Sequence, residues 1–128
     1  MIIRFYRCNY CGNIIIPIQD SGVNPVCCNE SMEDLVANST DAAGEKHVPI
    51  IEKSDHLITV KVGSTPHPMS SDHRIAWIAL VTNNALQAAK LTPEAAPEAT
   101  FSLASPSDDA KAYTYCNLHG LWVSESAN

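Results

Sequence analysis

The sequence predicts a mainly β chain in two parts, a small metal-stabilised domain followed by a β-sandwich. Four of the five cysteines fall within the first 28 residues, in a segment with few large apolar side chains. The rest of the chain alternates short apolar runs with turn signals, a pattern typical of sandwiches. Prolines at positions 93, 97 and 106 interrupt this region and disfavour long helices.

The first part, residues 1–37, is too short to be stable through an apolar core of its own. Segments of fewer than about 40 residues usually need a metal, disulfides or a partner chain. A bound metal would supply the missing folding energy. The expected elements are, in order, a strand over Ile2–Arg7, a Cys8-x-x-Cys11 turn, a strand over Asn13–Ile18, a loop over 19–25 and the adjacent pair Cys27-Cys28.

The spacing of these four cysteines favours a single metal site. Cys8-x-x-Cys11 presents two thiolates from one tight turn, and Gly12 relieves that turn. Neighbouring side chains of a regular strand point to opposite faces, so Cys27 and Cys28 reach one ion only where the backbone is irregular. A structural zinc site and a strained vicinal disulfide are the alternatives, and four thiolates serve iron and zinc alike.

The second part, residues 38–128, opens with a polar linker over Asn38–Gly44. Leu57–Val62 alternates apolar and polar residues, whereas Ile75–Val81 is nearly all apolar and reads as a strand buried on both faces. Asn83-Asn84 is a hairpin signal, although the return segment after it has helical composition. The other strands are expected at Ala85–Leu91, Thr100–Leu103, Lys111–Tyr115 and Leu121–Val123.

Composition excludes several classes of protein. The net charge of −6 and the lack of a basic stripe argue against a nucleic-acid binder. No apolar run is long enough to span a bilayer. Arg4 and Arg7 interrupt the apolar start, so we expect no signal peptide and a cytoplasmic location. In a reducing compartment, five cysteines are better explained as metal ligands or reactive thiols than as disulfides.

Outside the N-terminal cluster, one cysteine and four histidines form a second candidate metal-ligand set. His67 lies between two prolines, which hold its backbone stiff. Cys116 and His119 lie three residues apart in a turn that ends at Gly120. Thiolate and imidazole together suit redox iron or copper better than a purely structural ion. The complete set is His47, His67, His73, Cys116 and His119.

Two charged residues directly precede the first histidine of this set. If His47 binds metal, the Glu45 carboxylate could reach an open position on the ion, and the Lys46 ammonium could attract an anion. The alternative is a pair of solvated loop charges. His56, in the loop Ser54-Asp55-His56, reads as an ordinary surface histidine.

With these residues in view, the chain resembles the desulfoferrodoxins, the two-iron form of superoxide reductase. The resemblance extends over essentially the whole length. The four-cysteine segment is similar to a desulforedoxin-like domain, and the remainder is similar to the neelaredoxin-like catalytic domain. The motifs that carry it are Cys8-x-x-Cys11 with Cys27-Cys28, Glu45-Lys46-His47-Val48-Pro49, Gly63-Ser64-x-Pro66-His67-Pro68-Met69 and Cys116-Asn117-Leu118-His119-Gly120.

The resemblance implies a role for each residue of both metal sets. The four N-terminal cysteines are expected to hold a distorted tetrahedral iron, with zinc possible at this site in isolated protein. His47, His67, His73 and His119 are expected to form the equatorial plane of a second iron, with Cys116 axial. Glu45 is expected to take the sixth position in the oxidised state, and Lys46 to lie over the open face, where superoxide binds opposite Cys116.

The resemblance also implies a fold and an activity. The fold is an immunoglobulin-like, seven-stranded sandwich over 38–128, after the four-cysteine domain over 1–37. The activity is reduction of superoxide to hydrogen peroxide without formation of oxygen, in a homodimer that draws electrons from rubredoxin. A pure electron carrier working through the four-cysteine iron and a zinc-stabilised, non-redox binding module are the competing functions.

Overall fold

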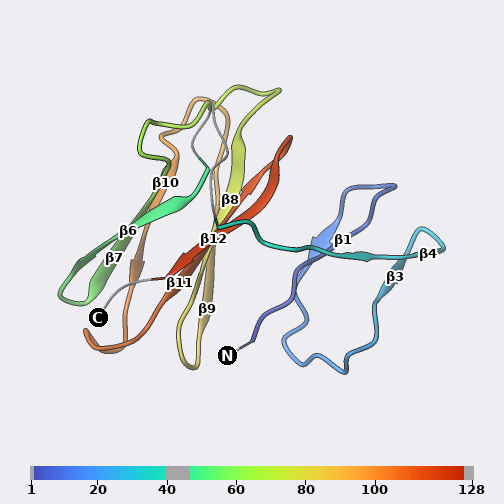
Figure 1. Cartoon of the computed structure of the whole chain (residues 1–128), viewed down its shortest axis with the longest axis horizontal. Helices are drawn as coiled ribbons and strands as arrows, with labels where there is room; N and C mark the ends of the chain where they lie inside the picture. The colour runs from blue at the N-terminus through green and yellow to red at the C-terminus, as the bar shows by residue number, and fades with distance from the viewer. Residues whose placement is uncertain (1, 40–46, 126–128) are drawn as a thin grey trace. The chain divides into compact units, whose positions relative to one another are not determined.

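The computed structural model describes residues 2–39 and 47–125, which divide into two compact units, Met1–Val36 and Ala37–Asn128 (Figure 1). Within the described residues every regular element is a strand. The predicted mainly β class is therefore confirmed. None of these residues forms a helix of the length and apolarity that a membrane crossing requires.

The first unit consists of very short strands. β1 (Tyr6–Arg7) lies between β2 (Ile14–Ile15) and β5 (Glu33–Asp34) in one sheet, and β3 (Val26–Cys27) pairs with β4 (Glu30–Ser31) in another. β1 and β2 are shorter than the expected strands, and β3 to β5 were not anticipated. The reason is burial: the outer ends of the expected strands, Ile2 and Ile18, are 92% and 87% exposed, so no core selects a longer strand.

The second unit is a sandwich of two antiparallel sheets. One sheet has the order β10-β7-β6, from β10 (Glu98–Ser102), β7 (Leu57–Val62) and β6 (Pro49–Ser54). The other has the order β12-β11-β8-β9. Its members are β12 (Gly120–Glu125), β11 (Lys111–Cys116), β8 (Ile75–Val81) and β9 (Leu86–Lys90). These seven strands, counted over residues 47–125, agree with the seven-stranded sandwich that the resemblance implied.

Apolar side chains from both sheets form the core of the sandwich. The alternation in β7 places Ile58, Val60 and Val62 on the inner face, where each is at most 1% exposed. β8 contributes Ile78 and Leu80 from the opposite sheet. Full burial of one such side chain contributes about 1.5–3 kcal/mol. Apart from Cys116, the buried side chains of this core cluster are aliphatic or aromatic and include no candidate metal ligand.

Several expected strands have the predicted bounds, and others do not. The strands over residues 57–62 and 75–81 are confirmed. The return strand of the Asn83-Asn84 hairpin forms despite its helical composition, because β9 pairs with β8 from Trp77↔Lys90 to Val81↔Leu86. β6 was not expected as a strand; its proline, Pro49, occupies the first position of an edge strand, where no ladder donor is needed.

The beginning of the expected linker is held against the sandwich. Asn38 forms a parallel bridge with Trp122, and its amide donates to Leu121 O at 2.9 Å. Val123 N donates in turn to Asn38 O at 2.9 Å. The rest of the expected linker, from residue 40 to 44, lies outside the described residues.

The registers bring five strand ends to one end of the sandwich. Pro49, where β6 starts, pairs with Val62, where β7 ends. Cys116, where β11 ends, pairs with Gly120 on β12 and with Ile75, where β8 starts. The segment before β6, the β7–β8 loop and the β11–β12 turn therefore meet at this end.

Candidate metal centres

The four cysteines of the first unit converge on one point. Their sulfur atoms all lie within 4.8 Å of one another. Cys11 Sγ is 3.7 Å from Cys27 Sγ, which is 3.9 Å from Cys28 Sγ. A tetrahedron with metal–sulfur bonds of about 2.3 Å has edges of about 3.8 Å, so the spacing fits one tetrahedral ion. All four are free thiols, so the vicinal disulfide considered from the sequence is not formed.

The first cysteine pair lies in a turn closed by backbone hydrogen bonds. Gly12 N donates to Cys8 O at 2.9 Å, and Cys8 N donates to Asn13 O at 2.8 Å. Gly12 has φ +84°, and a Cβ there would meet open space. Glycine is favoured here by the positive φ and not by close packing. This confirms the expectation that Gly12 allows the tight turn after Cys11 to form without strain.

The second pair occupies a left-handed hairpin turn. Cys28 and Asn29 have φ values of 52° and 62° and connect β3 to β4 as a two-residue loop. Positive φ at both central positions is the type I′ geometry. This is the irregular backbone that adjacent cysteines need in order to face the same ion. Left-handed backbone at a non-glycine residue costs about 1–2 kcal/mol, which metal binding offsets.

Hydrogen bonds within the cluster lower the pKa of one thiol and raise the pKa of two others. Cys11 N donates to Cys8 Sγ at 3.4 Å and lowers the pKa of Cys8 to about 6. Hydrogen bonds with Cys8 and Cys11 raise the pKa of Cys28 to about 12, and the pKa of Cys27 is raised for the same reason. In the absence of metal, Cys27 and Cys28 therefore keep their protons at neutral pH. A metal must displace them, so its apparent affinity rises with pH.

The second ligand set gathers at the end of the sandwich described above. One ligand atom from each of His47, His67, His73, Cys116 and His119 lies within 4.8 Å of the others. His47 is two residues before β6 and His73 two before β8; Cys116 ends β11 and His119 immediately precedes β12. All five residues identified from the sequence are thus brought together.

The four imidazoles form a closed ring of neighbours. Centroid distances are 4.8 Å for His47–His67, 4.9 Å for His67–His73, 5.1 Å for His73–His119 and 4.8 Å for His119–His47. His47 Nε2 lies 3.1 Å from His119 Nδ1. Two metal–nitrogen bonds of about 2.1 Å at a right angle put their nitrogens about 3.0 Å apart, so His47 and His119 fit neighbouring ligands of one ion.

The Cys116 thiol lies on the side of the four imidazoles that faces the protein interior. Cys116 is fully buried among the core residues, and its sulfur lies 3.6 Å from His119 Nδ1. His47 and His67 are buried, His73 is half-buried and His119 is exposed. The set therefore has one buried end, at the sulfur, and the opposite side faces away from the core.

Hydrogen bonds to the backbone hold the histidine-bearing loop. His67 Nδ1 is 2.8 Å from Pro68 O, and because only an N–H can donate to a carbonyl, Nε2 carries the lone pair available to a metal. Ser70 Oγ accepts from His73 N at 3.1 Å, and Ser70 N donates to His73 O at 3.0 Å.

Asn117 joins two ligand-bearing segments that are far apart in the sequence. Its Oδ1 accepts from Arg74 N at 2.8 Å and its Nδ2 donates to Asp72 O at 2.9 Å. Its own amide donates to Arg74 O at 3.2 Å. The residues on both sides of His73 are therefore tied to the turn that contains Cys116 and His119.

The supporting residues were not identified from the sequence. Asn117 lies inside the Cys116–His119 motif and Ser70 directly follows the motif that ends at Pro68-Met69, so their positions in the sequence could have identified them. Thr114, which is fully buried and donates from Oγ1 to His47 O at 3.2 Å, gave no such signal. His56 is exposed, lies 3.5 Å from Asp55 and belongs to neither set, as expected. Glu45 and Lys46 lie outside the described residues.

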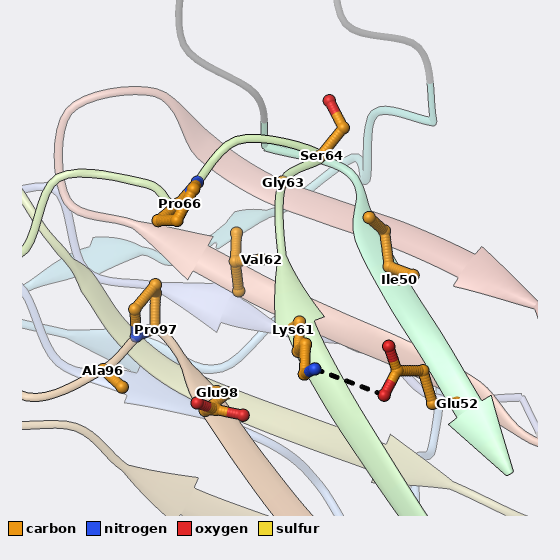
Figure 2. Close-up of a pocket in the computed structure, with 10 residues that line it drawn as sticks. All are labelled: Ile50, Glu52, Lys61, Val62, Gly63, Ser64, Pro66, Ala96, Pro97 and Glu98. Atoms are coloured by element: carbon orange, nitrogen blue, oxygen red, sulfur yellow. Dashed lines mark ion pairs between the residues drawn. The ribbon is translucent and has the colours of Figure 1, made fainter.

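A half-open pocket of about 470 Å³ lies elsewhere, across β6, β7 and β10 (Figure 2). Its charged groups include Lys61 and Glu52, which pair with each other at 3.3 Å. None of its ten lining residues belongs to either ligand set. The pocket is therefore not the candidate site.

Comparison with known proteins agrees with this arrangement. The family model described as Desulfoferrodoxin matches residues 39–125, and the model described as Desulfoferrodoxin, N-terminal domain, matches residues 3–35. The chain belongs to the desulfoferrodoxin family. Both matched ranges contain one complete ligand set.

Relatives extend over nearly the whole chain. A desulfoferrodoxin of Syntrophotalea carbinolica is 46% identical, covering 96% of both chains, and a desulfoferrodoxin homologue of Methanothermobacter thermautotrophicus is 44% identical over 93% of this chain and 95% of that one. The crystal structure of the superoxide reductase from Treponema pallidum matches with a TM-score of 0.82 and 33% identity, covering 96% of this chain and 98% of that one. The similarity to these proteins therefore extends over both units of this chain.

Removing metal from the four-cysteine unit should unfold residues 2–36 and leave the sandwich folded. The buried core cluster of the first unit consists of Tyr6, Cys8 and Met32, whereas the sandwich has a large apolar core. Amide hydrogen exchange before and after chelation under reducing conditions measures this. Protection that persists in residues 2–36 without metal would contradict the idea that the metal stabilises this unit.

Asn117→Ala should speed metal release from the five-residue set and lower the free energy of unfolding by about 1–3 kcal/mol, because two side-chain hydrogen bonds are lost. Chelator-driven metal release and urea unfolding measure the two effects. Asn84→Ala, in the exposed β8–β9 turn, is the matched control. An Asn117→Ala protein that releases metal at the wild-type rate would show that this bridge does not hold the site.

Proposed function

We propose that this desulfoferrodoxin is a superoxide reductase, which converts superoxide to hydrogen peroxide (O2•− + e− + 2H+ → H2O2) without producing oxygen. The observation that carries the proposal is the ring of four imidazoles over one buried thiol. Similar proteins support it: superoxide reductases from Treponema pallidum and from Pyrococcus abyssi resemble this chain, the latter with 35% identity over 68% of it.

The donor atoms fit iron. Five ligands exceed the four of a tetrahedral structural zinc site, and a thiolate mixed with imidazoles is typical of a redox metal. When bound, ferrous iron would supply the electron and an open coordination position. We assign His47, His67, His73 and His119 as equatorial ligands and Cys116 as the axial ligand.

The five ligands determine the net charge of the metal site. Neutral imidazoles and one thiolate leave a divalent ion with a net charge of about +1, which favours an anion over water. Cys116 would donate electron density to a bound iron from the core side. Superoxide approaches from the opposite side, which faces away from the core. The two protons come from water or a nearby acid, since the imidazole lone pairs are engaged.

Glu45 and Lys46 are assigned by their place in the motif. The chain carries a net charge of −6, so attraction of an anion must be local. We propose that Lys46 attracts superoxide to the open side. We propose that Glu45 takes the sixth position in the oxidised state and so closes the site after hydrogen peroxide leaves.

The four cysteines, Cys8, Cys11, Cys27 and Cys28, are proposed to hold a second iron in the domain over residues 1–37, with the catalytic domain over 38–128. Zinc at this site in isolated protein is an outcome that the same thiolates allow. Rubredoxin is the proposed electron donor, and the cytoplasm the proposed location, because free thiols persist in a reducing compartment. A pure electron carrier or a binding module would leave the five-ligand set without a use.

A homodimer is supported by the surface of the first unit. Several of its large apolar side chains are exposed. The equivalent unit of a second copy would cover them in a two-fold arrangement. The most exposed are Ile2 (92%), Ile18 (87%), Tyr10 (84%), Val36 (82%) and Val23 (74%).

Cys116→Ser should abolish superoxide reduction even when iron is bound. Serine keeps the size of the side chain but removes the thiolate, so we expect a loss beyond the 10–100-fold typical of contacts outside the ligand shell, more than about 100-fold. Pulse radiolysis on protein of measured iron content tests this. Wild-type rates in the iron-loaded variant would rule out an axial role for the thiolate.

Lys46→Ala should slow superoxide capture several-fold and flatten its dependence on ionic strength, because the local positive charge is lost. Lys46→Arg should retain most of the rate. Lys111→Ala changes the net charge equally but lies on β11, where Lys111 pairs with Glu125 at 3.3 Å, and serves as the matched control. Equal salt dependence in Lys46→Ala and Lys111→Ala would remove Lys46 from substrate capture.

A further inference from the structure

Trp122 lies flat against one of the four imidazoles. Its ring and that of His47 have centroids 4.6 Å apart and planes 13° from parallel. Both residues are buried, Trp122 at 8% and His47 at 5% exposure. The end torsion of a histidine side chain is intrinsically broad, so a large flat neighbour restricts the ring to one plane.

The same indole also binds the segment of a second histidine. Trp122 Nε1 donates to His119 O at 3.2 Å. His119 and His47 present the ring nitrogens that lie 3.1 Å apart, although the two residues are 72 positions apart in the sequence. One side chain therefore contacts both members of this pair, one through its face and one through its N–H.

Trp122 is itself held firmly. It pairs with Thr114 in the β11–β12 ladder and with Asn38 on its other side. Thr114, directly opposite, donates to His47 O at 3.2 Å. His47 is thus held at its carbonyl by one member of a cross-strand pair and at its ring by the other.

We propose that Trp122 is a positioning residue that fixes His47 and His119 relative to each other before metal binds. A ligand already held in its bound orientation loses less entropy on coordination, so metal affinity rises. The inference rests on the proposed five-ligand metal site but not on the reaction at that site. Metal retention tests it even if superoxide reduction fails.

The test is metal release from the full chain loaded with ferrous iron without oxygen, in excess chelator. Trp122→Phe keeps an aromatic face but loses the N–H donor, and should release iron from the five-ligand site about three- to tenfold faster. Trp122→Leu loses both contacts and should be faster again, in the 10–100-fold range typical of residues that support metal ligands. Partial rescue by phenylalanine separates positioning from general loss of packing.

Two controls come from the protein itself. The four-cysteine iron, followed by its own thiolate absorption, should leave at the wild-type rate in every variant. Trp77→Phe makes the same substitution at the other tryptophan, which stacks on Tyr115 at 5.4 Å instead of on a histidine, and should leave both release rates unchanged.

Each outcome decides the proposal. Wild-type release from Trp122→Phe overturns the hydrogen-bond role, and equal release from Trp122→Phe and Trp122→Leu overturns the stacking role. Equal acceleration by Trp77→Phe shows a general packing effect and also overturns it. If Trp122→Leu does not fold, the comparison of Trp122→Phe with Trp77→Phe still decides.

Discussion

The position of one sulfur atom in an apolar core governs the geometry of the larger site. Cys116 is the last residue of β11 and points inward among core residues from both sheets. The β11–β8 register shifts at this point, from Tyr115↔Trp77 to Cys116↔Ile75. A bulge of this kind re-aims a side chain and ends regular pairing. A thiolate buried among apolar groups is costly unless a cation compensates it, so this placement favours a bound metal on the side of the histidines.

The two units achieve stability in different ways, and the difference suits their sites. In the first unit the buried cluster is small, Tyr6, Cys8 and Met32 with Cys27 packed against it, and strained backbone at Cys28 persists because the turn aims that sulfur at the others. In the sandwich, an apolar core holds the strands, and the ligands lie at the end of β11 and in the loops and turns next to the strands. A five-ligand set supported by such a core can be arranged before the metal arrives, whereas the four-cysteine set and its fold form together.

The sequence was most informative where a pattern is local. Alternation identified the inner face of Leu57–Val62, and proline and glycine identified the stiff and tight turns that hold His67 and Cys11. The candidate ligands could also be identified, because thiols and imidazoles are chemically distinctive. The sequence was uninformative where strand pairing between distant segments determines a contact. Thr114 and Trp122 both contact His47 only because β11 and β12 pair in one particular register. Likewise, β9 forms a strand because it pairs with β8, although its composition favours a helix.

The arrangement explains how a site can serve a very small anion without a pocket. A two-atom substrate offers little shape to recognise, so selectivity must come from charge and access. Cys116 is buried in the core, and the four imidazoles are neighbours around one centre. In the proposed site, superoxide would reach the metal from the outward side, where a local positive charge attracts an anion over a short range although the net charge of −6 repels anions at longer range. The pocket across β6, β7 and β10 has the size for a larger ligand, but it contains no metal-binding set, and the proposed reaction does not need it.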